Sequence, residues 1–457
     1  MKVFPHNITK SRKNSRNSGS NSRKNSRNSR RNNKTKKLSN NRIRLQNITC
    51  DSIEQKLSVN QTNKVLQELG KGASGIAFKG CLDLPECTHG VSIKYISIVK
   101  KHKYSNDEND PKHPANIEYN LGKSLSKLVE ENKTPHINIT IHNFKCNLSN
   151  LTKIQHQTFS QPKATEWLQL TQRKLDNNVI FERINVIFNE LADMDLQTYI
   201  LNHSKKLTHQ DHLILLFQLC YTLTCIQFEY RNFRHNDIKP NNLLVEIDRY
   251  VKHKNNNYIA YKIFGKTFYL PQTRYIMKLY DFDFGYSDQF QNYKITTPSP
   301  FFNQKGYTPQ TNCLYDLHSY INFYYFKFKH ILSDETKSLL KSLVPTDDNI
   351  VNKNYTNKNY MMQNNSNKGL ENTLLGKFTD YTNKYKLTSF RMDGKFNYVP
   401  KKMYSCADLL CYHPTIFKQF EAPLPPNARI IHTYESNISL TPETEKRRDM
   451  FNIKVNN

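Results

Sequence analysis

The stretch RHNDIKPNNLLV, Arg234 to Val245, decides the fold that this sequence predicts. It follows a strongly apolar segment, His209 to Tyr230, whose hydrophobic residues recur with a helical period. Its last residues are apolar, as in a buried strand. Between the two, a polar loop carries Asp237, Lys239 and Asn242 at offsets zero, two and five. The sequence therefore predicts a core helix, a loop with a carboxylate, an ammonium group and an amide, and then a strand.

Upstream, NKVLQELGKGASGIAFKGCL (63–82) alternates apolar residues on both sides of a glycine cluster. Gly70, Gly72 and Gly75 form a GxGxxG pattern, which dinucleotide-binding folds also carry. Those folds open a helix at the last glycine, whereas GIAFKG is short and typical of a strand. The pattern favours a hairpin that forms a flexible lid, so that backbone N–H groups can approach phosphates.

A lysine and a glutamate follow the hairpin. Lys94 lies in the predicted strand 90–98, 19 positions after Gly75. A strand lysine is usually solvated, but its place after the hairpin favours a functional role. Segment 116–130 has apolar residues at helical spacing, with Glu118 in its first turn. Glu118 either favours the helix dipole or holds the Lys94 ammonium against phosphates.

The net charge of +28 is concentrated at the N-terminus, where fifteen Lys and Arg precede the first acidic residue, Asp51. Residues 11–37 contain no apolar side chain, so a disordered tail is predicted. Residues 1–44 are a candidate tether to nucleic acid or an acidic partner, a nuclear-localisation signal, or a solubilising extension.

Composition also indicates a compartment. The nine cysteines are scattered without metal-ligand spacing, which favours reduced, mostly buried thiols of an intracellular protein. We expect a cytoplasmic location, with a nuclear or virion location as the alternatives. The chain has no apolar run of about 18 residues and no secretory signal, so no membrane partner is expected.

The loop pattern H-x-D-x-K-x-x-N, preceded by the glycines, Lys94 and Glu118 and followed by LYDFDFGYS (279–287), resembles the eukaryotic-type protein kinases. HNDIKPNNLLV and YDFDF resemble in particular the serine/threonine-protein kinases of giant DNA viruses of the Mimivirus type. The resemblance covers about Asn63 to His330. It implies an α+β fold with two lobes, a small β-rich N-lobe and a larger, mainly helical C-lobe.

The implied organisation has four parts. They are a disordered basic tail (1–60), an N-lobe (61–190) with a polar insertion near 146–178, a C-lobe (191–425) with insertions near 249–275 and 345–370, and a C-terminal tail (426–457). Alternating aromatic residues near 249–275 predict an enlarged hairpin, and Tyr404 to Phe420 predicts the last packed helix.

The resemblance also implies the roles of the site residues. Asp237 is the base that accepts or orients the proton of a protein hydroxyl, and Lys239 neutralises the transferred phosphoryl group, as in kinases that act on Ser or Thr. His235 is implied to be a packing residue. The cofactors are ATP and Mg²⁺. The residues implied to bind ATP are Leu69, Gly70, Lys71, Gly72, Ala73, Ser74, Gly75, Ile76, Ala77, Lys94, Glu118, Glu190 and Ala192; the metal candidates are Asn242, Asp281 and Asp283.

The two aspartates of DFDF allow two alignments. Starting at Asp283, the motif is an intact Asp-Phe-Gly, but Asp281 then occupies a strand position that is normally buried and apolar, where an unpaired carboxylate is costly. Starting at Asp281, Leu279 points into the core and Asp283 replaces the glycine. We favour Asp281 as the metal ligand and keep Asp283 as the alternative.

Three departures from the family pattern matter. Asn236 replaces an arginine that binds a phosphorylated activation loop, which predicts that such phosphorylation is not needed. About 38 residues separate Asn242 from Asp281, where the family has about a dozen. No Ala-Pro-Glu follows, although Asp316 and Ser319 match the residues that brace the catalytic loop. The alternatives are a pseudokinase scaffold, a kinase of small molecules, and a nucleic-acid-tethered module that uses the basic tail.

Overall fold

The structure, a computed structural model, describes residues 45, 47–59, 65–72, 75–82, 87, 90–100, 105–248, 251, 256–297, 309, 313, 315–343 and 404–439. The chain divides into two units, Met1–Asn47 and Ile48–Asn457, and the fold below is that of the second. The predictions on the basic tail 1–44, on Ala73 and Ser74, and on the insertion 345–370 lie outside the described residues.

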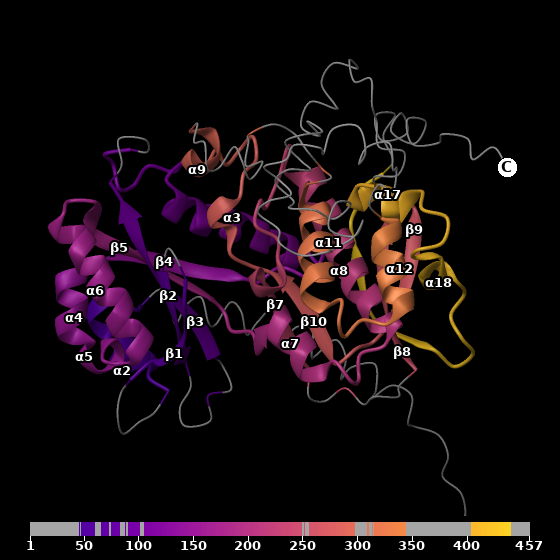
Figure 1. Cartoon of the computed structure of the whole chain (residues 1–457), viewed down its shortest axis with the longest axis horizontal. Coiled ribbons are helices and arrows are strands. Elements are labelled where there is room, and N and C mark those ends of the chain that lie inside the picture. The colour runs from indigo at the N-terminus through magenta and orange to yellow at the C-terminus, as the bar shows by residue number, and fades with distance from the viewer. Residues whose placement is uncertain are drawn as a thin grey trace, which may run out of the picture. The chain divides into compact units, whose positions relative to one another are not determined.

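A five-stranded antiparallel sheet forms one half of this unit (Figure 1). Its strands, in spatial order, are β1 (Gln67–Lys71), β2 (Gly75–Cys81), β3 (Gly90–Val99), β5 (Ile180–Glu190) and β4 (Thr140–Asn147). Helix α3 (Pro114–Glu130) contacts the sheet through Ala115, which clusters with Ile96, Ile98 and Ile187. Its apolar residues three and four apart lie on one helix face and join the core cluster of the C-terminal half; they are Ile117, Leu121, Leu125 and Leu128. The helix starts at Pro114, so Glu118 lies in its second turn and not in the first as predicted.

The polar insertion near 146–178 folds into α4 (Leu148–Ile154), α5 (His156–Phe159) and α6 (Pro162–Asp176). Its sequence carries little signal because α6 buries only Ala164, Trp167 and Thr171. Figure 1 shows these helices beside β1 and β2. In the predicted disordered segment 1–60, the structure contains the 3-10 helix η1 (Cys50–Ser52) and α2 (Ile53–Leu57), so disorder was the wrong prediction there. Both end residues of α2 are buried in the core.

Helices dominate the other half of the unit, which confirms the predicted two-lobed α+β fold. They are α7 (Leu196–His203), α8 (His209–Glu229), α11 (Tyr315–Phe328), α12 (Asp334–Ser342), α17 (Cys406–Cys411) and α18 (Lys418–Glu421). The last two occupy the segment predicted as one helix; Pro414 stands between them, where it would disfavour a continuous helix. Among the described helices, α8 alone is long and apolar enough to cross a membrane, and 83% of its most apolar window is buried, as in a core helix.

Two three-stranded sheets complete this half. One contains β10 (Tyr275–Leu279), β7 (Leu243–Ile247) and β6 (Met194–Asp195). The other contains the predicted enlarged hairpin, β8 (Asn257–Ile263) and β9 (Lys266–Pro271), which is joined by β11 (Arg429–Glu435) parallel to β8. The C-terminal segment from 426 is therefore partly a strand, where the sequence predicted a tail.

Four cysteines form disulfides, Cys50 with Cys146 and Cys81 with Cys87. The prediction of reduced thiols is wrong for these four. The first pair is separated by 96 positions and meets only because η1 lies beside the end of β4. The spacing of the cysteines along the sequence therefore could not predict this disulfide.

Strand β11 is tied to the end of α3 by one residue, Asn132, whose backbone is left-handed with φ 63°. Its Nδ2 donates to the Thr433 carbonyl at 2.7 Å, and its Oδ1 accepts from His432 Nε2 at 2.7 Å. The Asn132 carbonyl accepts from the Glu435 N–H at 3.2 Å. A C-terminal strand thereby fixes the far end of the helix that carries Glu118.

Substitutions at Asn132 should separate these contributions. Asn132→Gly keeps the left-handed backbone but removes both side-chain hydrogen bonds, so we expect a loss of about 1–2 kcal/mol in the free energy of unfolding. Asn132→Ala adds the strain of a left-handed alanine and should lose about 1–2 kcal/mol more. Denaturant unfolding of both variants measures the difference; equal stability of Asn132→Ala and the unmodified protein would contradict the tie.

Candidate active site

Lys94 joins three segments at the centre of the site. Its Nζ lies 2.5 Å from Glu118 Oε1 of α3 and 2.7 Å from Asp281 Oδ1 of the loop after β10. The lysine side chain is 12% exposed and that of Glu118 is 5% exposed, so little water screens the contact. The residues that the sequence placed in one site thus meet, although 187 positions separate Lys94 from Asp281.

The surroundings keep this group charged. Burial by itself lowers the pKa of Lys94. The nearby carboxylates of Asp281 and Glu118 raise this pKa by more than burial lowers it, so the net pKa lies well above its usual value. For Asp281 the effect of burial has the opposite sign, because burial raises the pKa of a carboxyl group. The Lys94 ammonium lowers the pKa of Asp281 by more than burial raises it, so the net pKa lies below its usual value. At neutral pH this contact joins an ammonium to a carboxylate.

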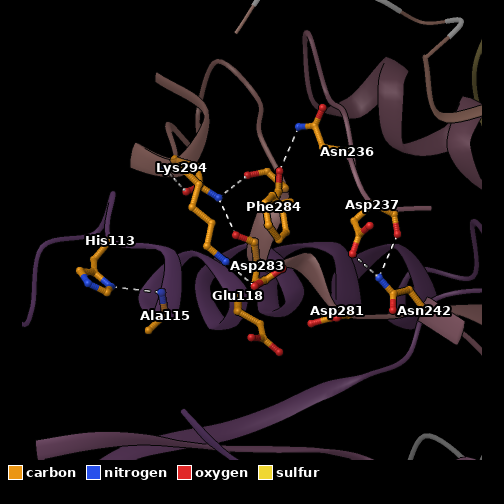
Figure 2. A network of polar contacts seen from close by, with 12 residues as sticks. His113, Ala115, Glu118, Asn236, Asp237, Asn242, Asp281, Asp283, Phe284 and Lys294 are labelled. Atoms are coloured by element: carbon orange, nitrogen blue, oxygen red, sulfur yellow. Dashed lines mark hydrogen bonds and ion pairs between the residues drawn. The ribbon is translucent and has the colours of Figure 1, made fainter. Parts of the chain in front are cut away.

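The two aspartates of DFDF face different partners, and Figure 2 shows the one that faces Lys294, Asp283. Asp281 has a left-handed backbone with φ 65° and precedes the 3-10 helix η3 (Phe282–Phe284). This conformation turns its carboxylate to Lys94, while Leu279 is fully buried. Asp283 Oδ2 instead lies 2.5 Å from Lys294 Nζ. The geometry is the one expected from the Asp281 alignment.

The catalytic-loop pattern forms a compact polar group. Lys239 Nζ lies 2.7 Å from Asp237 Oδ2. Asn242 Nδ2 donates to the Asp237 carbonyl at 2.9 Å and to Asp237 Oδ2 at 2.7 Å, as Figure 2 shows. Asn242 ends the 3-10 helix η2 (Pro240–Asn242), directly before β7. All three predicted residues are therefore in mutual contact.

Helix α11 supports this loop. Asp316 accepts from the His235 N–H at 2.8 Å and from the Asn236 N–H at 3.0 Å, and Ser319 Oγ donates to the Ile238 carbonyl at 2.9 Å. These contacts agree with the bracing roles that the resemblance implied.

His235 connects the loop to the metal-candidate segment. Its Nε2 donates to the Tyr280 carbonyl at 2.8 Å, and its ring packs 5.3 Å from that of Phe282. The side chain is buried and already hydrogen-bonded, which fits packing rather than proton transfer.

The glycine-rich segment is the predicted hairpin of β1 and β2. The Gly72 N–H donates to the Gly75 carbonyl at 2.8 Å and closes the turn. A Cβ at Gly75 would lie 2.3 Å from the Tyr95 carbonyl oxygen, so glycine is required for the approach of β3. A Cβ at Gly70 would meet no atom within 4 Å, and one at Gly72 would make an ordinary contact with the Gly75 carbonyl oxygen at 3.9 Å.

Side chains of the hairpin differ in direction. Ala77 is paired with Lys94 and shares its face of the sheet, whereas Ile76 pairs with Tyr95 on the opposite face. Lys71 forms an ion pair with Glu166 of α6, and Leu69 is 45% exposed. Of these side chains, only Ala77 lies on the Lys94 face by this register.

Glu190 ends β5, and Ala192 follows in the connection between the lobes. The Glu190 carboxylate lies 2.6 Å from the buried Lys278, which also contacts Glu246 at 2.7 Å. The backbone of Glu190 is also engaged inside the protein, because its N–H donates to the Ile139 carbonyl at 2.8 Å and its carbonyl accepts from Asn138 Nδ2 at 3.2 Å. The contacts of Glu190 therefore support the connection between β5 and the helical half and do not assign this residue to a ligand.

Comparisons with known proteins agree with the geometry. The family model of the poxvirus serine/threonine protein kinases matches residues 112–380, more than half of the chain. The chain belongs to this kinase family. A serine/threonine-protein kinase of Acanthamoeba polyphaga mimivirus is 27% identical over 214 residues, 46% of this chain and 45% of the relative. A second one of the same virus is 40% identical over 68 residues, 15% of this chain and 17% of the relative. The matches thus span less than half of either curated relative.

The donor set of this viral-type kinase fits a magnesium ion. Asp281 offers a carboxylate, and Asn242 offers its amide oxygen, since its amide nitrogen donates to Asp237. Both are hard oxygen ligands, and Mg²⁺ commonly uses one or two protein ligands and completes its shell with phosphates and waters. The described residues contain no group of three or more His, Cys, Asp or Glu placed to bind a metal, so a site made by the protein alone is not found there.

Gln161 of the insertion, which no sequence pattern indicated, supports the kinase hairpin. Strand β1 lies at the edge of the sheet, and Gln161 pairs with its free side like an added strand. Its Nε2 donates to the Leu66 carbonyl at 2.7 Å, and its Oε1 accepts from the Glu68 N–H at 2.9 Å. Glu68 in turn accepts from the Ala164 N–H of α6 at 3.0 Å. A polar residue in a segment with a weak pattern gives no sequence signal of such a role.

Replacing Gln161 should loosen the hairpin. In Gln161→Ala, the edge of β1 loses two hydrogen bonds, and we expect faster amide hydrogen exchange at residues 66–71 with the rest of the sheet unchanged. Gln169→Ala, at an exposed position of α6, the helix that Gln161 directly precedes, is the matched control. Equal exchange rates in the two variants would show that Gln161 does not restrain the hairpin.

Proposed function

We propose that this kinase transfers the γ-phosphoryl group of ATP to a Ser or Thr hydroxyl of a protein substrate, with Asp237 as the catalytic base. The observation that carries the proposal is the joint assembly of two groups, Lys94 with Glu118 and Asp281, and Asp237 with Lys239 and Asn242. Phosphoryl transfer needs mainly placed charges, and the first group supplies one cation and two carboxylates, while the second supplies one cation, one carboxylate and one amide.

Each residue has a defined task in this proposal. Lys94, oriented by Glu118, binds the ATP phosphates, while the hairpin covers them with backbone N–H groups. Asp281 and Asn242 hold Mg²⁺, which when bound neutralises phosphate charge. Asp237 orients the acceptor hydroxyl and takes its proton, and the Lys239 ammonium, 2.7 Å from Asp237, stabilises the transferred phosphoryl group.

Protein Ser and Thr side chains are the proposed acceptors because Lys239 stands two positions after the base. A pseudokinase scaffold is less well supported, since Lys94, Asp237 and Asp281 are all present and in ordered contacts.

A direct assay tests the activity. The full-length protein is incubated with γ-labelled ATP, Mg²⁺ and generic basic or acidic protein substrates. Asp237→Ala should lower label transfer by about 10²–10⁴-fold, because the placed base is lost. Asp334→Ala, at a side chain that is 96% exposed, should leave transfer unchanged. Equal incorporation by the Asp237 variant and the unmodified enzyme would overturn the assignment.

Isosteric substitutions distinguish the two aspartates as metal ligands. Asp281→Asn should abolish or strongly weaken Mg²⁺-dependent binding of a fluorescent ATP analogue, since an anionic oxygen ligand is lost. Asp283→Asn should leave the Mg²⁺ concentration for half-maximal binding nearly unchanged, because its carboxylate faces Lys294. The opposite order of effects would assign the metal to Asp283.

A further inference from the structure

The segment after DFDF is held to η3 by a buried asparagine. Asn292 caps the short helix α9 (Tyr293–Thr296) by accepting from the Lys294 N–H at 3.0 Å. Its Nδ2 donates to the Asp283 carbonyl at 2.9 Å and to the Gly285 carbonyl at 3.0 Å. Asn292 is completely buried. The position of α9 is therefore coupled to that of η3, which follows Asp281.

An ion pair strengthens the same junction. Lys294 Nζ lies 2.5 Å from Asp283 Oδ2 and 4.1 Å from the centre of the Phe284 ring, and Figure 2 shows the lysine extending to Asp283. The side chain of Lys294 is only 14% exposed and that of Asp283 only 10% exposed. Water screens such a pair weakly, so removing one partner leaves a poorly solvated charge.

The other side of α9 contacts the N-terminal lobe. The Tyr293 N–H donates to the Lys112 carbonyl at 3.0 Å, and the Tyr293 hydroxyl donates to Asp110 Oδ2 at 3.0 Å. Asn116, in the first turn of α3, donates to the Asp110 carbonyl at 2.8 Å. Helix α9 thus connects η3 to the start of the helix that carries Glu118.

The catalytic loop contributes no exposed arginine at this junction. Asn236, at the family's arginine position, is uncharged and donates to the Phe284 carbonyl at 3.0 Å. Arg234, the nearby arginine of the loop, is fully buried and stacks 3.8 Å from the centre of the Tyr315 ring. The ion pair at this junction is therefore made within the segment after DFDF, between Asp283 and Lys294, and involves no arginine of the catalytic loop.

We propose that Asp283, Lys294 and Tyr293 form a permanent latch that holds α3 in position and keeps Glu118 on Lys94 without a phosphate. Asp283, which occupies the glycine position of the family motif, acts as a fixed anion for Lys294. The three are positioning residues. They hold α3 so that Glu118 orients Lys94, and Lys94 in turn binds the phosphates of ATP in the proposed function. The effect of the latch on turnover rests on the proposed kinase activity, whereas its effect on the order of α3 does not.

The test combines hydrogen exchange with kinetics on the full-length protein after phosphatase treatment. Asp283→Gly, which restores the family's residue, and Lys294→Met should each raise amide exchange in residues 112–118 and 290–297 about tenfold. Each should also lower kcat about tenfold, and the double variant should be no worse than either single one, because both remove one ion pair. Lys337→Met, which removes a surface ion pair with Asp334 on α12, is the matched control and should match the unmodified protein in both measurements.

Several outcomes would overturn the latch. Unchanged exchange at 112–118 in both latch variants would show that the pair does not position α3, whatever the activity. Full activity of Asp283→Gly would show that the carboxylate is dispensable, and loss of activity of the unmodified enzyme on phosphatase treatment would show that a phosphate is needed. If the unmodified protein has no kinase activity but the exchange differences are found, the proposed function fails and the latch stands.

Discussion

The buried ammonium of Lys94 requires compensation, and two carboxylates from distant parts of the chain provide it. Burial of an unpaired charge is costly, so this lysine is stable in the sheet only while Glu118 and Asp281 remain close to it. The requirement couples β3, α3 and the loop after β10 into one unit. Helix α3 and the segment around Asp281 also share an apolar contact, because Ile117 and Leu121 of α3 lie in one core cluster with Leu279 and Phe282.

Segments added to the kinase fold act on this unit from outside. The insertion between β4 and β5 covers the edge of β1 through Gln161, and β11 fixes the end of α3 through Asn132. On the opposite side, α9 joins the start of α3 to η3. In each case a polar side chain satisfies backbone groups of a neighbouring element, which restrains position at little cost in buried apolar area.

Much of the fold could be predicted because its signals are local. The strongly apolar composition of 209–230 located α8, which is buried on all sides from Leu213 to Ile226. The alternating residues located the hairpin of β1 and β2, and the cost of a buried carboxylate pointed to Asp281 facing Lys94. The predictions failed where a segment has few apolar residues or where two distant segments meet. Three features were not predicted for one of these two reasons: the short helix α2, strand β11, and the disulfide between Cys50 and Cys146.

The sequence by itself determined which groups the site contains, their order along the chain and the class of fold that carries them. Residue type, spacing and period are enough for this, because each is a property of a short stretch. Only the tertiary structure decided that Asp283 pairs with Lys294, that Glu190 pairs with Lys278, and that Gln161 completes the edge of β1. These choices depend on which polar groups lose their water together, and that is defined only when the chain has folded.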